Sequence, residues 1–202
     1  MLELTTGKLD EACVYLSGPM EFVADHGVEW RRKFIRLVQE KELQIDIIDP
    51  TNKPGGDEMR IGENKEHQAM LKREGRWQEL QDYVWSYRHY DLRFVDNCDF
   101  LVAVIDTRVP QWGTSNEIYM AEDQRKPIFF ICDGGMKNMP NWLFPLIEFE
   151  NKEEHKRCNV FESVEAVIAE LVGYDIGHYA MGREWILLRK HLKKLRAMRS
   201  VR

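Results

Sequence analysis

The sequence has few cysteines, and none of them are paired at a spacing that would bind a metal. Cys13, Cys98, Cys132 and Cys158 are the four cysteines in 202 residues, and no C-x-x-C pair occurs. Three of them lie in or beside apolar segments, which favours reduced thiols in a core over a disulfide or metal site. Both types of glycine-rich nucleotide-binding motif are also missing. We therefore expect neither a metal ion nor a cofactor.

Long hydrophobic runs are missing as well. The longest apolar run, residues 100–105, is followed directly by Asp106, whereas crossing a bilayer takes about 18 apolar residues. The first residues contain no basic stretch followed by an apolar one, as a signal peptide would. These features predict a cytoplasmic protein with no membrane partner.

Charge is distributed unevenly along the chain. The formal net charge is −5, but residues 183–202 hold eight basic residues and one acidic residue, which gives +7 and leaves −12 for residues 1–182. Four apolar residues recur at helical spacing within the basic end: Trp185, Leu188, Leu192 and Leu195. This pattern predicts a basic amphipathic helix in an extension over residues 176–202. Its charges either solvate a packed helix, which we prefer, or dock on nucleic acid or an acidic partner.

Short apolar segments alternate with amphipathic patterns through the rest of the chain. The apolar segments span residues 14–16, 45–48, 100–105, 128–132 and, more weakly, 160–161. Continuous apolar strands alternating with helices predict an α/β three-layer sandwich with a parallel five-stranded sheet. Ligands bind outside the carboxyl ends of such strands. We expect one domain over residues 1–175, with residues 53–76 as an insertion, either a lid or a solvated segment without a role.

A carboxylate interrupts an apolar helical stripe. The stripe within residues 77–95 places Asp91 where a hydrophobic residue is expected. Because burying an unpaired carboxylate is costly, Asp91 must be paired, protonated or directed at a cavity. It lies nine residues before Phe100, about 13 Å along an ideal helix, near the level of the following strand's carboxyl end. A capping or salt-bridging role is the alternative.

A second carboxylate follows the strand that ends at Asp106. Gly113 permits a tight turn, Thr114 or Ser115 suits a helix N-cap, and Glu117 then falls in the first turn of the helix. There the helix dipole holds a carboxylate ionised, as a carboxylate nucleophile requires. The alternative is a capping box between Thr114 and Glu117, a common structural device.

The turn after the first strand is the third candidate region. It places small residues where backbone amides approach a sugar or phosphate, and it contains Ser17, Gly18, Pro19 and Met20. His26 lies in the same connection and, with Arg31, is a candidate for contact with an anionic group. For the arginine, surface charge is the alternative.

Together these motifs resemble the nucleoside 2-deoxyribosyltransferase family. The resemblance covers about residues 14–142 and rests on the order of three motifs: Tyr15-Leu16-Ser17-Gly18-Pro19, Asp91-Leu92 with Asp99, and Gly113-Thr114-Ser115-Asn116-Glu117. It implies a flavodoxin-like fold and cleavage of an N-glycosidic bond. By the resemblance, Glu117 is the nucleophile, Asp91 contacts and protonates the base, and Tyr15 positions Glu117. Its partners would be a nucleoside or nucleotide, a free base and further copies of the chain in a homo-oligomer.

The chain departs from the family pattern at several positions. Gln111 stands six residues before Glu117, where some members carry an Asp that binds sugar hydroxyls. Asp106 is a candidate replacement, and Asn141 is a candidate for the residue that a neighbouring subunit contributes. A phosphoribohydrolase, which also uses a Gly-Thr-x-x-Glu turn, and a non-catalytic nucleotide-binding module are the alternative functions.

Overall fold

The computed structural model shows a five-stranded parallel sheet, and it describes residues 7–52, 61–149 and 158–177. Its strands are β1 (Cys13–Ser17), β2 (Asp46–Ile48), β3 (Phe100–Ile105), β4 (Ile128–Cys132) and β5 (Val160–Phe161). They are arranged in the order β2-β1-β3-β4-β5, which is the flavodoxin-like order. The predicted fold and its five strands are confirmed. The basic helix predicted for the C-terminal extension lies almost wholly outside the described residues.

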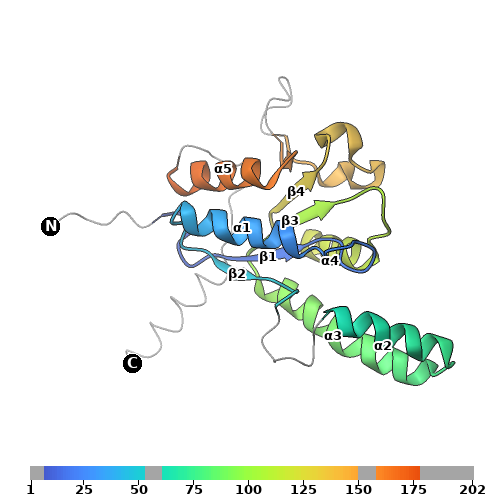
Figure 1. The fold of residues 1–202 in the computed structure, drawn as a ribbon. Helices are drawn as coiled ribbons and strands as arrows, with labels where there is room; N and C mark the ends of the chain where they lie inside the picture. The colour runs from blue at the N-terminus through green and yellow to red at the C-terminus, as the bar shows by residue number, and fades with distance from the viewer. Residues whose placement is uncertain (1–6, 53–60, 150–157, 178–202) are drawn as a thin grey trace, which may run out of the picture.

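Helices cover both faces of the sheet (Figure 1). Alternate residues of each central strand face opposite layers. Val14 and Val102 pack with α1 (Val28–Glu40) and α5 (Val164–Asp175). Tyr15 and Ala103 face the layer that contains α3 (Trp77–Asn97) and α4 (Trp112–Asp123). Burial on both faces explains why these strands read as continuous apolar runs.

Helices α2 (Ile61–Arg73) and α3 form a hairpin that extends from the body of the fold (Figure 1). The rings of His67 and Tyr83 meet edge to face at 5.0 Å across this hairpin. Only the C-terminal part of α3 enters the core, because Asp91 and Val95 are its buried residues, whereas Trp77 near its start is 63% exposed. The predicted insertion is therefore a helix over residues 61–73 in its described part.

Short 3-10 helices, η2 (Gly135–Asn138) and η3 (Asn141–Leu146), follow β4. The four cysteines are free thiols, and three of them are buried, as predicted. No helix in the described ranges is long and apolar enough to cross a membrane.

Candidate active site

Glu117 on α4 is held by two hydroxyl groups of β1. The Tyr15 hydroxyl donates to Oε1 of Glu117 at 2.8 Å, and the Ser17 hydroxyl donates to Oε2. Tyr15 and Ser17 point to the same side of β1 because residues two apart in a strand share a face. Each carboxylate oxygen of Glu117 thus accepts one hydrogen bond, which sets the orientation of the group.

The structure corrects the predicted start of α4. The helix begins at Trp112, and its N-cap, Gln111, makes no side-chain capping hydrogen bond. The predicted cap at Thr114 or Ser115 is therefore wrong, Glu117 lies beyond the first turn, and the alternative of a capping box between Thr114 and Glu117 is excluded. The Gln111 amide instead donates to the Val104 carbonyl at 3.1 Å and accepts from the Asp106 amide at 3.2 Å. These bonds close the turn between β3 and α4.

Burial governs the protonation of Glu117. Its side chain is enclosed, and burial raises its pKa to about 7, with the charge of Asp91 acting in the same direction. The hydrogen bonds from Ser17 and Tyr15 and the charge of Arg31 oppose this rise. The expectation that the helix dipole holds Glu117 ionised is therefore wrong, because desolvation outweighs the groups that favour the charge. Burial and the negative charge of Glu117 raise the pKa of Tyr15, so the Tyr15 hydroxyl keeps its proton and remains a hydrogen-bond donor.

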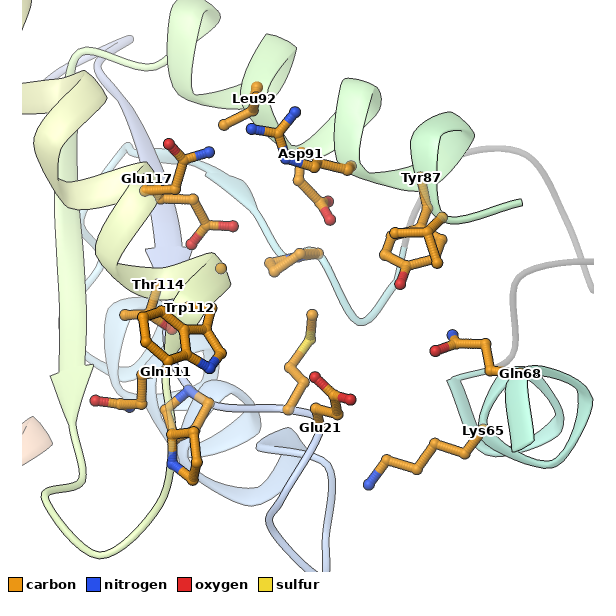
Figure 2. Close-up of a pocket in the computed structure, with 18 residues that line it drawn as sticks. Glu21, Lys65, Gln68, Tyr87, Asp91, Leu92, Gln111, Trp112, Thr114 and Glu117 are labelled. Atoms are coloured by element: carbon orange, nitrogen blue, oxygen red, sulfur yellow. The ribbon is translucent and has the colours of Figure 1, made fainter. Parts of the chain in front are cut away.

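Asp91 lies within α3 and is 7% exposed. It lines a cavity of about 530 Å³ whose wall also includes Glu117, and both labelled carboxylates face this space in Figure 2. The prediction that Asp91 reaches the level of the strands' carboxyl ends is confirmed, since Pro19 after β1 lines the same cavity. An end-of-helix capping role does not fit, because α3 continues to Asn97.

The cavity brings together most of the predicted site residues. It is lined by Pro19, Met20, Asp91, Gln111, Gly113, Thr114 and Glu117. Tyr15 and Ser17 do not line the cavity themselves, but their hydroxyl groups are hydrogen-bonded to Glu117, which does. Gly18 packs behind the turn, where a Cβ would lie 3.0 Å from the Trp30 ring, and its carbonyl accepts from Arg31 Nη2 at 3.2 Å. The size is within the usual range for small-molecule pockets, roughly 300–1,000 Å³.

Three predicted residues lie elsewhere. His26 Nδ1 is 3.4 Å from the Met20 carbonyl. Asp106 forms an ion pair with Arg108 at 2.8 Å and lines a second cavity of about 420 Å³ together with Trp30. Asn141 is exposed at the start of η3. The structure does not bring these three side chains to the cavity that holds Glu117. For Asn141 the prediction concerned the site of a neighbouring subunit, and it stays a prediction.

Arg31 is buried, although its position on an amphipathic helix favoured a surface location. It is 0% exposed, and its guanidinium donates to the carbonyls of Leu16, Gly18 and Gly27. Nε also lies 3.7 Å from Asp49. Its donors therefore brace the loop after β1, and an anionic ligand would have to compete with three backbone carbonyls.

Sequence reasoning missed the wall of the cavity formed by the hairpin. This wall includes Lys65, Gln68, Val84, Tyr87, Arg88 and Leu92. Apart from Leu92, which belongs to the Asp91-Leu92 motif, no motif marks these residues, although the apolar stripe of α3 includes positions 84 and 87. Glu21 and Trp112 were also missed; they line the cavity from the loop after β1 and from the start of α4. In the described part of the chain, no cluster of three or more His, Cys, Asp or Glu side chains is arranged to hold a metal ion.

Comparisons with known proteins find two similar solved structures and one matching family model. A 2-desoxiribosyltransferase from Leishmania mexicana is similar at 17% identity and a TM-score of 0.38, over 60% of this chain and 64% of that one. A conserved protein from Enterococcus faecalis V583 is similar at 15% identity and a TM-score of 0.41, over 82% of this chain and 88% of that one. No match is found among curated proteins. The model of one family, nucleoside 2-deoxyribosyltransferase, matches residues 14–161, and the chain belongs to this family.

Proposed function

We propose that the protein cleaves the N-glycosidic bond of a deoxynucleoside or deoxynucleotide and transfers the 2-deoxyribosyl group to a second base or to water. One observation carries the proposal: a buried Glu117 carboxylate, held at both oxygens by Tyr15 and Ser17, faces a cavity that Asp91 also faces. Two carboxyl groups around one cavity are what glycosyl transfer with retention requires, one as nucleophile and one as proton donor.

In the first half-reaction, an oxygen of Glu117 attacks the anomeric carbon of the sugar. A carbon–oxygen bond forms, the carbon–nitrogen bond to the base breaks, and its electron pair leaves with the base. Asp91 donates a proton to the departing base. Tyr15 and Ser17 hold the attacking carboxylate in one orientation, since each donates to a different oxygen.

In the second half-reaction, a nitrogen of the acceptor base attacks the anomeric carbon, and the ester bond to Glu117 breaks. The electron pair returns to Glu117, and Asp91 takes the proton that the acceptor loses. Water in place of the base gives free deoxyribose and hydrolysis.

The proton that Asp91 needs is consistent with the charges of the site. Asp91 raises the pKa of Glu117, and this repulsion between carboxylates is mutual. The pair therefore retains one proton at higher pH than two separated carboxyl groups would. Burial places this proton on Glu117, whereas the first step uses an ionised Glu117 beside a protonated Asp91, so the proton must pass from Glu117 to Asp91 before the base leaves.

Incubation with a deoxynucleoside and a different free base, followed by chromatography, tests the proposal. A new deoxynucleoside indicates transfer, and free base with deoxyribose indicates hydrolysis. Glu117→Gln should abolish both reactions and the mass gain of one deoxyribosyl group on the intact protein. Glu122→Gln, on the exposed side of the same helix, is the matched control. Unchanged nucleosides, or activity retained in Glu117→Gln, would overturn the proposal.

A further inference from the structure

Helix α2 forms one wall of the cavity and contributes a cationic side chain, Lys65, to it. Lys65 and Gln68 lie one turn apart on α2, so they share a face of the helix, and both line the cavity. Figure 2 shows them extending from α2 toward the space that Asp91 and Glu117 face from across the cavity. Edge-to-face contact between His67 and Tyr83 joins α2 to α3 at this level.

Tyr87 connects this wall to Asp91. It precedes Asp91 by four residues on α3, so the two share a helical face. The Tyr87 hydroxyl is hydrogen-bonded to the Gln68 side chain. In Figure 2, Asp91 lies between Glu117 and Tyr87. A base that leaves the sugar carbon attacked by Glu117 and takes a proton from Asp91 therefore extends toward Tyr87 and the two α2 side chains. This orientation rests on the proposed function.

We propose that Lys65 determines base specificity by donating a hydrogen bond to a carbonyl oxygen on the base edge remote from the glycosidic bond. A lysine ammonium has three donors and no acceptor. An oxo group on the base accepts such a bond, whereas the amino group of adenine or cytosine directs its own hydrogens at the ammonium. The site thus selects 6-oxopurines and 4-oxopyrimidines over the corresponding amino bases.

Deoxyinosine and deoxyadenosine form the sharpest test because they carry the same sugar and differ at the 6-position of the purine. We expect kcat/KM for base release to favour deoxyinosine about tenfold, since a hydrogen bond to a charged group is strong. Lys65→Met keeps an apolar stem and removes the donors, so the ratio should fall to about 1. Lys65→Glu supplies an acceptor and should reverse the preference. Deoxyuridine and deoxycytidine should show the same order.

Lys72→Met is the control, because Lys72 is exposed near the end of the same helix and should keep the wild-type ratio. A ratio near 1 in the wild type, a preference for deoxyadenosine, or a preference that persists in Lys65→Met would overturn the assignment. Glu21 also lines the cavity, and its carboxylate would accept from an amino base. A preference for amino bases that Glu21→Gln removes would assign the selection to Glu21 instead.

The same ammonium suits a phosphate, so nucleoside 5′-monophosphates are included in the comparison. A preference for deoxyinosine monophosphate over deoxyinosine that disappears in Lys65→Met would place a phosphate at Lys65 and overturn base selection. If no nucleoside is cleaved, the proposed function fails, and calorimetric binding of hypoxanthine and adenine then decides the inference. Tighter binding of hypoxanthine, lost in Lys65→Met, supports it; equal or absent binding contradicts it.

Discussion

The Tyr15 hydroxyl donates a 2.8 Å hydrogen bond to Oε1 of Glu117 across 102 positions of the sequence. β1 supplies the hydroxyl and α4 the carboxylate, so this contact exists only when the helix after β3 has packed on the sheet. Because Tyr15 is fully buried, its ring cannot turn toward water when Glu117 changes its charge. The hydrogen bond therefore favours the ionised form of Glu117 against the burial that disfavours it.

Tyr15→Phe removes this donor while keeping the ring in the core. The pKa of Glu117 should rise, because the Tyr15 hydrogen bond lowers it in the folded protein. We expect kcat at pH 7 to fall about tenfold, in line with the usual size of a hydrogen bond to a charged group. Steady-state kinetics should also show the acidic limb of the pH profile displaced to higher pH. A lower kcat with an unmoved limb would indicate a purely structural role for Tyr15.

The pH dependence of the wild-type enzyme should report the ionisation of Glu117. The proposed nucleophile must be ionised, and its pKa is about 7. Activity should therefore decline as the pH falls through that value, by about tenfold for each pH unit well below it, and should decline again at higher pH, where Asp91 loses the proton that it donates. Measurement of kcat/KM from pH 5 to pH 9 checks this expectation. A limb near 4.5, the ordinary glutamate pKa, would show that burial does not control this group.

The same pKa makes Glu117 a source of pH-dependent stability. A pKa of about 7 in the folded protein, against 4.5 ordinarily, means that the folded state binds this proton more tightly than the unfolded state. The stabilisation is complete below pH 4.5 and is lost as the pH rises through 7, a change of about 3 kcal/mol. The free energy of unfolding of the wild type should fall by that amount relative to Glu117→Gln between these limits. Urea titrations check it, and a pH-independent difference would contradict it.

The sequence was sufficient to predict the sheet and two carboxylates of the candidate site. Strands buried on both faces appear as continuous apolar runs, and Asp91 was noticeable because it interrupts an apolar stripe. Glu117 was identified by resemblance to the family, since a helix cap was the simpler interpretation of its spacing. The start of α4 could not be predicted from the sequence. It depends on hydrogen bonds between the Gln111 side chain and the backbone at the end of β3, and no pattern of residues indicates such a contact.

The residues that the α2–α3 hairpin contributes to the cavity could not be predicted from the sequence either. Lys65 and Gln68 belong to a polar segment with no apolar periodicity, and their position depends on how α2 packs against α3. Arg31 was misinterpreted because a charged residue on an amphipathic helix normally faces solvent. Its burial follows from the carbonyls of Leu16 in β1 and of Gly18 and Gly27 in the loop after it, and these become neighbours only in the folded chain.

Asp91→Asn tests the proposed proton donor. An asparagine of similar size cannot donate an acidic proton, so departure of the base should slow about 100-fold, with a smaller effect on KM. Nucleosides whose bases leave readily without protonation should be affected less. Rapid-quench measurement of the first turnover checks this, with Asp82→Asn, exposed on the same helix, as the control. Unchanged base release would remove Asp91 from the acid role.

Arg31→Met tests the bracing of the loop that carries Pro19 and Met20 to the cavity. The variant keeps most of the apolar stem but leaves three buried carbonyls without the donors that Arg31 provides and removes the partner of Asp49. The free energy of unfolding should fall by about 3 kcal/mol, as measured in urea. Arg32→Met is the matched control because Arg32 is exposed on the same helix, where substitutions change stability by about 0.5 kcal/mol or less. Equal losses in the two variants would show that the buried guanidinium contributes nothing specific, whereas a loss confined to Arg31→Met, with a raised KM, would connect the loop's stability to the shape of the site.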